Sequence, residues 1–270
     1  MKSRIYAIFI ICLMLFLMIA PIRAMDTSSY NANDNKFVVG FDSEFPPFGY
    51  KDVNGEYTGF DIELAKEVCK RNNWTFVAQP LSGWAAKEME LDSGLIDCIW
   101  SELTINGREN DYLWSKPYFN SSQVVVVKSN SGIEKLEDLK GKNVEVQEGS
   151  SVLKVLDGEK KALKDSFGSF SLIHDYNTGF MDLATGVCDA IIVDIPSAKY
   201  QLVEKNSTNG YKILEEQIAS EQYGIGFKKG NTELKNQVQA TLDEMYKDGT
   251  VEKIADKYKQ YGISDGLIKT

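Results

Sequence analysis

The sequence predicts an α/β protein in which parallel β-sheets are covered by helices. Strand-like apolar runs alternate with amphipathic stretches of helical length between residues 37 and 261, which is the pattern of successive β-α-β units. A turn-rich stretch over residues 116–122 interrupts this pattern, and a fresh β-α-β series begins at Asn143. With 270 residues, the chain is long enough for two modest lobes or one large domain.

Each element is predicted from the spacing of its apolar residues. Short runs of apolar residues predict strands over residues 37–41, 75–80, 96–100, 123–128, 143–146, 169–174, 190–193 and 224–227. A spacing of about 3.6 residues predicts helices over residues 61–72, 85–93, 133–139, 152–164, 178–185, 195–203, 232–248 and 250–261. Asp61 and Glu63, at the start of the first helix, are explained by the attraction of carboxylates to a helix N-terminus.

The N-terminal 24 residues have the features of a signal peptide. Lys2 and Arg4 precede an apolar run from Ile5 to Ala20, and the small residue Ala24 marks a plausible cleavage point. An uncleaved membrane anchor is the alternative, but the apolar run is short of the ~20 residues that span a bilayer. No lipobox leads to a cysteine. We therefore expect a periplasmic or secreted protein, with residues 25–35 as a polar leader.

The charge of the mature chain limits its partners. Removal of Lys2, Arg4 and Arg23 with the signal peptide leaves 27 basic against 39 acidic residues, a net charge of −12. Nucleic acids and anionic membranes require basic surfaces, so neither is expected as a partner.

The cysteines and the histidine give no sign of a metal or cofactor. Cys69, Cys98 and Cys188 remain after cleavage and lie in apolar surroundings. We predict that they are small buried residues, with a disulfide as the alternative. His174 is the only histidine, so a zinc site or a Ser-His-Asp triad is not expected.

Several motifs together resemble one protein family. The segment from Gly59 to Val68 reads GFDIELAKEV, and further matches follow at residues 96–100, 114–118, 136–141 and 188–194 and at Arg108. In this order they resemble the polar-amino-acid family (family 3) of extracytoplasmic solute-binding proteins, which deliver amino acids to ABC importers. The resemblance covers nearly the whole mature chain.

The resemblance implies an architecture that periodicity alone does not predict. It implies a two-lobed periplasmic-binding-protein fold of type II, with the ligand in the cleft between the lobes. Lobe one would comprise residues 36–121 and 222–270, and lobe two residues 122–221. It also implies a monomer that closes on a free amino acid and is then recognised by a membrane permease.

A free amino acid needs partners for its carboxylate. An arginine can hold a carboxylate with two parallel hydrogen bonds. By the resemblance, Arg108 stands at the position of the family's carboxylate-binding arginine, and Thr104 at that of its hydroxyl residue. Ser150 and Ser151 lie on a turn that precedes a predicted helix, where the family places a second carboxylate contact; capping that helix is their alternative role.

The ammonium group and the hydrophobic cover also have candidates. Asp194 follows a predicted strand and resembles the family's ammonium-binding aspartate, although it could instead cap the following helix. Phe45 and Trp84 resemble the aromatic residues that cover the ligand from lobe one. Packing in the core is the alternative for both aromatic residues.

Asp42, Gln147 and Glu102 are candidates for the side-chain pocket. Asp42 and Gln147 match positions that the family uses for side-chain recognition. Glu102 stands where the family usually has glycine, and the loop before Arg108 is one residue shorter than usual, so Glu102 could face either the cleft or solvent. No second basic group is apparent, and the surplus of carboxylates favours a neutral polar amino acid, a cationic one or cystine over an acidic one.

Two alternative functions remain on the same fold. Cyclohexadienyl (arogenate) dehydratases resemble this family but use a glutamate on the turn where this chain has Ser150, Ser151 and Val152. No clear pair of acid and base groups is present, so an enzyme is not expected. A ligand-sensing receptor module is the other alternative.

Overall fold

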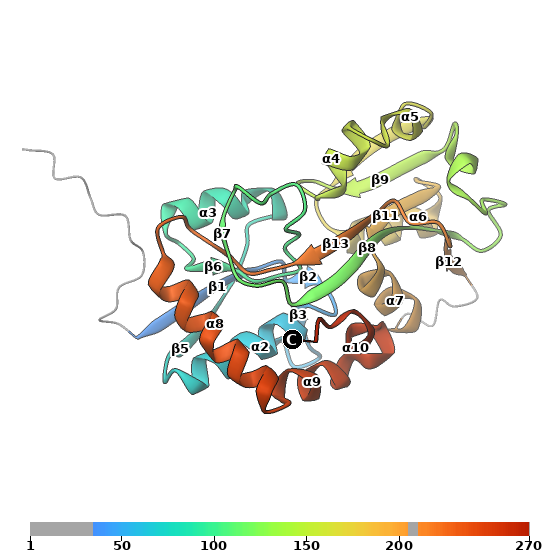
Figure 1. The fold of residues 1–270 in the computed structure, drawn as a ribbon. Helices are drawn as coiled ribbons and strands as arrows, with labels where there is room; N and C mark the ends of the chain where they lie inside the picture. Colours follow the sequence, from blue (N-terminus) through green and yellow to red (C-terminus); the bar gives the residue numbers. More distant parts are fainter. Residues whose placement is uncertain (1–34, 205–209, 270) are drawn as a thin grey trace, which may run out of the picture.

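The computed structural model describes residues 35–204 and 210–269, which form two sheets that lie side by side with helices around them (Figure 1). The first sheet has the order β5 (Thr75–Pro80), β1 (Lys36–Phe41), β6 (Cys98–Ile99), β14 (Gly226–Phe227) and β7 (Leu113–Trp114). The second has the order β10 (Ser169–Ile173), β9 (Asn143–Gln147), β11 (Ala190–Asp194), β8 (Phe119–Lys128) and β12 (Tyr211–Ile213), and β13 (Ala219–Tyr223) also pairs with β8. A small third sheet contains β2 (Glu44–Phe45), β3 (Gly49–Lys51) and β4 (Tyr57–Thr58). The α/β prediction is confirmed, but the two large sheets are mixed and not wholly parallel as predicted. β14 pairs antiparallel with β6 and β7, and β8 pairs antiparallel with β11 and β12.

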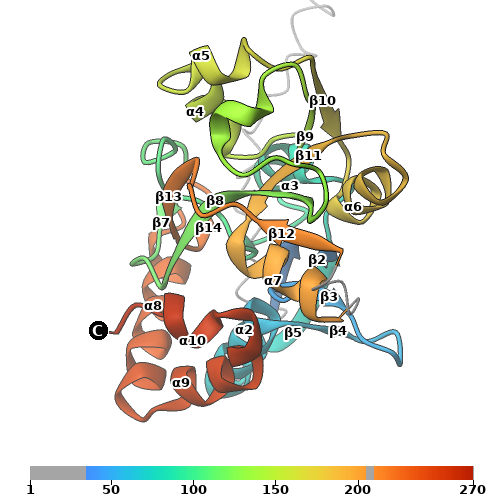
Figure 2. The same ribbon diagram turned by 90° about the vertical axis from the view of Figure 1, so that its right-hand side faces the viewer.

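We call the first and third sheets with their helices lobe one, and the second sheet with its helices lobe two. The helical segments of lobe one are α2 (Phe60–Arg71), η2 (Trp84–Ala86), α3 (Lys87–Ser93), α8 (Thr232–Lys247), α9 (Thr250–Ala255), η4 (Asp256–Tyr261) and α10 (Ile263–Gly266). Those of lobe two are η3 (Leu136–Leu139), α4 (Val152–Asp157), α5 (Lys161–Lys164), α6 (Tyr176–Thr185) and α7 (Ile195–Glu204). Figure 2 shows α8 and α9 beside α2, at the opposite end of the molecule from α4 and α5.

The central strand β8 has a continuously apolar sequence because both of its faces are covered. Val124 and Val126 pack into the cluster that includes residues of α6 and α7, whereas Val125 and Val127 pack with residues of η3 and α4. All four side chains are buried. A strand covered on both faces needs apolar residues at every position instead of alternate ones.

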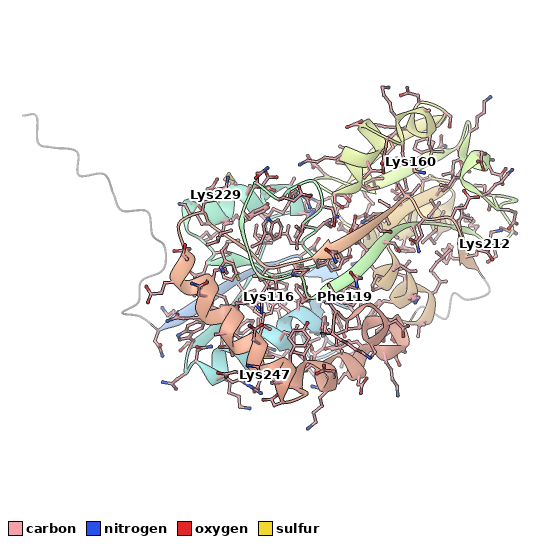
Figure 3. All side chains as sticks on the ribbon, in the orientation of Figure 1. Lys116, Phe119, Lys160, Lys212, Lys229 and Lys247 are labelled. Carbon is pink, nitrogen blue, oxygen red and sulfur yellow. The ribbon has the colours of Figure 1, made fainter. Side chains whose placement is uncertain are left out.

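Two antiparallel strand segments join the lobes. The start of β8 pairs with β13, so that Phe119 lies opposite Tyr223 and Gln123 opposite Ala219. The rings of Phe119 and Tyr223 stack with centroids 5.5 Å apart, and Figure 3 labels Phe119 at this junction. The predicted turn over residues 116–122 is therefore wrong from Phe119 onward. Its polar residues are held in a strand by pairing with β13, a contact between distant parts of the chain.

Other differences from the predicted elements are local. The helix predicted over residues 152–164 divides into α4 and α5 at Gly158, whose backbone (φ −108°, ψ −108°) leaves the helical region. Only a 3₁₀ turn, η3, forms within residues 133–139, and the helix predicted over residues 250–261 continues beyond α9 as the 3₁₀ segment η4.

The cysteine prediction is confirmed. Cys69, Cys98 and Cys188 are buried free thiols, and burial raises the pKa of each thiol above its ordinary value. The predicted signal peptide lies outside the described residues. Within the described ranges, no helix has the length and apolar character needed to cross a membrane.

Candidate functional site

The carboxyl ends of strands from both lobes face each other across a cleft, which is where open α/β sheets place ligands. Gln147, at the end of β9, donates a hydrogen bond from Nε2 to Oδ2 of Asp42, just after β1, at 2.7 Å. Arg108 Nη2 donates to the carbonyl oxygen of Gly149 at 2.8 Å. The ten residues predicted to form the site are all buried: Asp42, Phe45, Trp84, Glu102, Thr104, Arg108, Gln147, Ser150, Ser151 and Asp194.

Two cationic side chains lie together on one side of this cleft. Lys87 Nζ donates to the carbonyl oxygens of Trp84 at 3.1 Å and Gly149 at 3.4 Å, and Gly149 also accepts the bond from Arg108. Lys87 Nζ lies 4.7 Å from the centroid of the Trp84 ring. Burial and, to a smaller extent, the neighbouring Arg108 charge lower the pKa of Lys87 to about 8. The expectation that no second basic group lines the site is therefore wrong.

The sequence contains a signal that would have identified Lys87. Trp84 and Leu91 belong to one buried cluster. Lys87 lies three residues after Trp84 and four residues before Leu91. That spacing places it on the apolar face of the helical segment. The side chain is only 2% exposed, whereas a lysine on such a segment is ordinarily solvated.

The junction between the lobes contributes a glutamate that the sequence analysis missed. Glu221, on β13, accepts hydrogen bonds from Thr104 Oγ1 at 2.9 Å and from Ser151 Oγ at 2.6 Å. One donor belongs to lobe one and the other to lobe two. Asp194 lies next to Glu221 and accepts a hydrogen bond from the hydroxyl of Tyr223. Burial and the negative charge of Glu221 raise the pKa of Asp194 well above its ordinary value.

The hydroxyl of Ser151 does not cap the following helix. Ser151 is the residue before α4, but its side chain makes no capping hydrogen bond and donates to Glu221 instead. The capping alternative is thus wrong for the Ser151 side chain. Ser150, also buried, precedes it on the same turn.

Glu102 faces the interior and not solvent. Its side chain is only 5% exposed, and its Oε2 accepts a hydrogen bond from Ser101 Oγ at 2.5 Å. Its backbone has a positive φ of 39°, and its N–H donates to Asp61 Oδ2 at 2.8 Å. Burial, followed by the nearby charge of Asp42, raises the pKa of Glu102 well above its ordinary value.

Asp61 holds the backbone of Glu102 and also contacts Tyr118. Its other oxygen, Oδ1, accepts a hydrogen bond from the hydroxyl of Tyr118 at 2.9 Å, and the side chain is fully buried. The attraction of a carboxylate to the helix N-terminus is therefore an insufficient explanation for Asp61. Burial outweighs the two hydrogen bonds and raises its pKa to about 7.

This raised pKa predicts a pH-dependent effect of Asp61→Asn on stability. Between about pH 4 and pH 7 the folded protein retains a proton on Asp61 that the unfolded chain has lost, so this group lowers the free energy of unfolding as pH rises. The variant lacks this dependence. Its free energy of unfolding, relative to the wild type, should therefore rise across that range by roughly 4 kcal/mol at most. Urea unfolding at several pH values measures this difference, and a constant difference would contradict the assignment.

Aromatic side chains border the cleft on both lobes. The rings of Phe45 and Tyr176, from lobes one and two, meet edge to face with centroids 5.6 Å apart. Trp84, which like Phe45 belongs to lobe one, lies beneath the ammonium group of Lys87. At the rim, Asn177 Nδ2 donates to Glu44 Oε2 at 2.5 Å, so Glu44 also contacts the opposite lobe.

The sequence from residue 37 to residue 261 matches the family described as bacterial extracellular solute-binding proteins, family 3. The chain belongs to this family. The match spans both lobes and the two strand segments that join them. The resemblance identified from the motifs is therefore confirmed, as is the two-lobed periplasmic-binding-protein fold, because solved structures of such proteins superimpose on this one.

Three relatives of this solute-binding protein illustrate the range of similarity. The L-cystine-binding protein TcyJ of Escherichia coli is 31% identical over 82% of this chain and 81% of its own. A substrate-binding protein of an ABC uptake transporter from Streptococcus pneumoniae, solved with bound histidine, has a TM-score of 0.81 at 31% identity and covers 86% of this chain and 94% of its own. An ancestral arginine-binding protein bound to arginine has a TM-score of 0.76 at 38% identity and covers 83% of this chain and 98% of its own.

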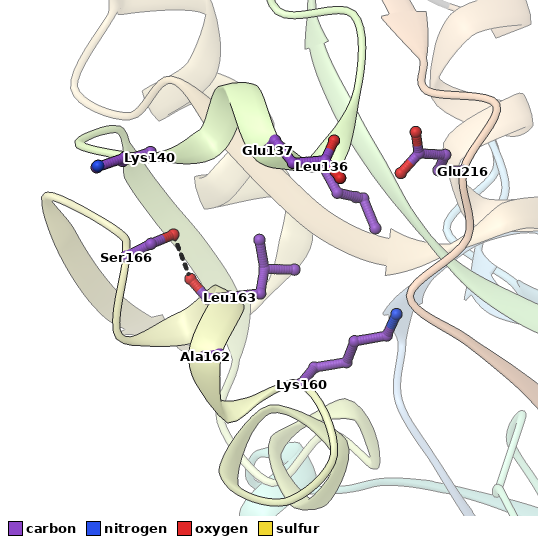
Figure 4. A pocket seen from close by; sticks show the side chains of 8 residues that line it. All are labelled: Leu136, Glu137, Lys140, Lys160, Ala162, Leu163, Ser166 and Glu216. Carbon is purple, nitrogen blue, oxygen red and sulfur yellow. Dashed lines mark hydrogen bonds between the residues drawn. The ribbon is translucent and has the colours of Figure 1, made fainter.

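Two surface hollows of this solute-binding protein, each of about 410 Å³, differ in their relation to the cleft. One lies at the cleft mouth, where Lys87 and Arg108 of lobe one face Gly149 and Ser150 of lobe two. The other lies on lobe two alone, between η3, α5 and the segment before β13, and Figure 4 shows its mixed lining of leucine, lysine and glutamate side chains. Only the first is continuous with residues of the predicted site.

Proposed function

We propose that this protein is the extracytoplasmic binding component of an ABC importer and that it holds a free polar amino acid between its lobes. The observation that carries the proposal is the arrangement of charge in the cleft. Arg108 lies opposite the Gly149 turn, and Asp194 and Glu221 lie at the junction of the lobes. A zwitterion requires groups of both signs, and a neutral polar amino acid, a cationic one and cystine all meet this requirement.

Each predicted residue has a proposed role. Arg108 binds the ligand carboxylate with help from Thr104 and the Ser150–Ser151 turn, because a guanidinium offers two parallel donors. Asp194 binds the ammonium group. The aromatic residues Phe45 and Trp84 cover the ligand, and the polar residues Asp42, Glu102 and Gln147 surround its side chain.

Binding is coupled to closure of the lobes. Residues 36–121 with 222–270 form one proposed moving unit, and residues 122–221 form the other, so the boundary crosses the paired segments of β8 and β13. Each unit carries only part of the site, and a ligand that bridges them shifts the equilibrium toward the closed form. A permease in the membrane then recognises the closed monomer. Residues 1–24 act as the signal peptide that directs the protein to the periplasm or outside the cell.

The chain is a binding protein and not an enzyme. The relatives named above are described as binding proteins. The turn after β9 presents Ser150 and Ser151 to the cleft, and the carboxyl groups there contact hydroxyl and amide donors instead of forming a separated acid and base pair.

A ligand screen tests the proposal. The protein is first freed of any bound ligand by unfolding and dialysis, and its thermal unfolding is then measured with each common amino acid and with cystine. A ligand at 100 times its Kd stabilises the folded state by about 2.7 kcal/mol, so at least one polar amino acid should raise the Tm clearly. The absence of any shift, or consumption of prephenate or arogenate by the protein, would overturn the proposal.

A further inference from the structure

Glu102 occupies a central position among the carboxyl groups of the cleft. Its charge interacts with those of Asp42, Asp61 and Asp194. Its Oε2 accepts the bond from Ser101, but Oε1 receives no hydrogen bond from any of the described residues. Oε1 is not one of the fully enclosed polar atoms that lack a partner, so it keeps some exposed surface and is able to accept a hydrogen bond from a ligand.

The backbone holds Glu102 in this position at an energetic cost. A φ of 39° is uncommon for any residue other than glycine. The hydrogen bond from the Glu102 N–H to Asp61 fixes this conformation, and Ser101 holds both Asp42 and Glu102 by accepting from the Asp42 N–H at 3.1 Å and donating to Glu102. Ser101 thereby joins the backbone of Asp42 to the carboxyl group of Glu102, and the charges of the two carboxyl groups repel each other.

Carboxyl groups outnumber basic groups in the cleft. Among the described residues, five buried carboxyl groups, those of Asp42, Asp61, Glu102, Asp194 and Glu221, accompany two basic groups, those of Lys87 and Arg108. A neutral zwitterion leaves this surplus unchanged, since its own charges cancel. An additional positive charge near Asp42 and Glu102 reduces the surplus, and a carboxylate in the same place increases it.

We propose that Glu102, together with Asp42, binds the positively charged end of the ligand side chain, so that the ligand is a basic amino acid such as arginine, lysine or ornithine. This inference rests on the proposed amino-acid-binding function and narrows it. The α-carboxylate lies at Arg108, the ammonium group at Asp194, and the side-chain cation at Glu102. Charge-assisted hydrogen bonds to a buried carboxylate are stronger than neutral ones, and therefore Glu102 sets the preference for charge.

Arginine and citrulline provide the sharpest test, because they are similar in shape and differ in side-chain charge. Calorimetry on the ligand-free wild type should show tighter binding of arginine than of citrulline by about 10-fold or more. Lysine should likewise exceed norleucine. Glu102→Gln keeps the shape of the side chain and removes its charge, and should reduce the ratio of arginine to citrulline affinity by about 10-fold.

Two further variants separate recognition from a structural role. Glu102→Gly accommodates the positive φ without strain, so it should fold at least as well as the wild type and still lose the preference for arginine. Glu44→Gln removes a carboxylate at the rim of the cleft and should leave the preference unchanged. A general loss of stability would lower both affinities together and leave their ratio intact.

The outcomes distinguish this inference from the function on which it rests. If cystine or a neutral amino acid binds more tightly than arginine, lysine and ornithine, or if Glu102→Gln leaves the ratio unchanged, the inference is wrong and the binding function stands. If no amino acid binds the wild type at all, the proposed function itself fails.

Discussion

Replacing Arg108 or Asp194 by alanine is expected to abolish amino-acid binding while leaving the protein folded. Arg108 contributes the guanidinium that faces the Gly149 turn, and Asp194 contributes the carboxyl group beside Tyr223 and Glu221. Removal of one partner from a buried charge pair costs about 2–5 kcal/mol, because the other charge stays desolvated without compensation. The affinity should therefore fall by at least about 30-fold.

The structure provides a matched control for each substitution. Arg71 is the other arginine within the described residues, and it forms ion pairs with Glu67 and Asp248 on the surface of lobe one. Asp189 precedes β11, of which Asp194 is the last residue, and accepts a hydrogen bond from the Asn143 N–H. Arg71→Ala and Asp189→Ala should retain binding. Titration calorimetry measures the affinities and circular dichroism the fold. Near-normal affinity in either cleft variant would refute the site.

The ten predicted site residues are buried together because many of them follow strand ends. The sequence places Asp42 after β1, Glu102 after β6, Gln147 at the end of β9 and Asp194 at the end of β11. Parallel strands bring such positions to one edge of a sheet, so local patterns locate this part of the site. Local patterns do not predict that the two lobes face each other across the cleft. That arrangement came from the family resemblance and the structure.

The residues that were missed depend on contacts between distant parts of the chain. Glu221 lies in the polar segment Ala219–Tyr223, which has no strand periodicity of its own and becomes a strand by pairing with the start of β8. Its burial requires Thr104 and Ser151 from opposite lobes, and no local pattern contains this information. Asp61 differs, because its spacing from Leu64 and Val68 already placed it on the buried face of α2.

Gly59, the first residue of the motif GFDIELAKEV, has a structural requirement that explains why this motif begins with glycine. Its φ is 126°, and a Cβ atom at this position would lie 2.2 Å from the carbonyl oxygen of Phe48. The backbone approaches so closely because the N–H groups of Phe60 and Asp61 donate to the carbonyl oxygens of Pro47 and Phe48. The start of α2 is thus attached to the turn that carries Asp42 and Phe45.

Gly59→Ala is therefore expected to destabilise the protein severely. An unfavourable φ alone costs about 1 kcal/mol in the left-handed region, and displacing a backbone carbonyl costs about 1–3 kcal/mol more. Gly55→Ala is the matched control, since Gly55 also has a positive φ of 82° but a Cβ there would meet no atom within 4 Å. Urea unfolding should show a loss at least twice as large for Gly59→Ala as for Gly55→Ala. Equal losses of stability in the two variants would mean that the turn carrying Asp42 and Phe45 can move independently of α2. The helix would then have no part in positioning these two residues.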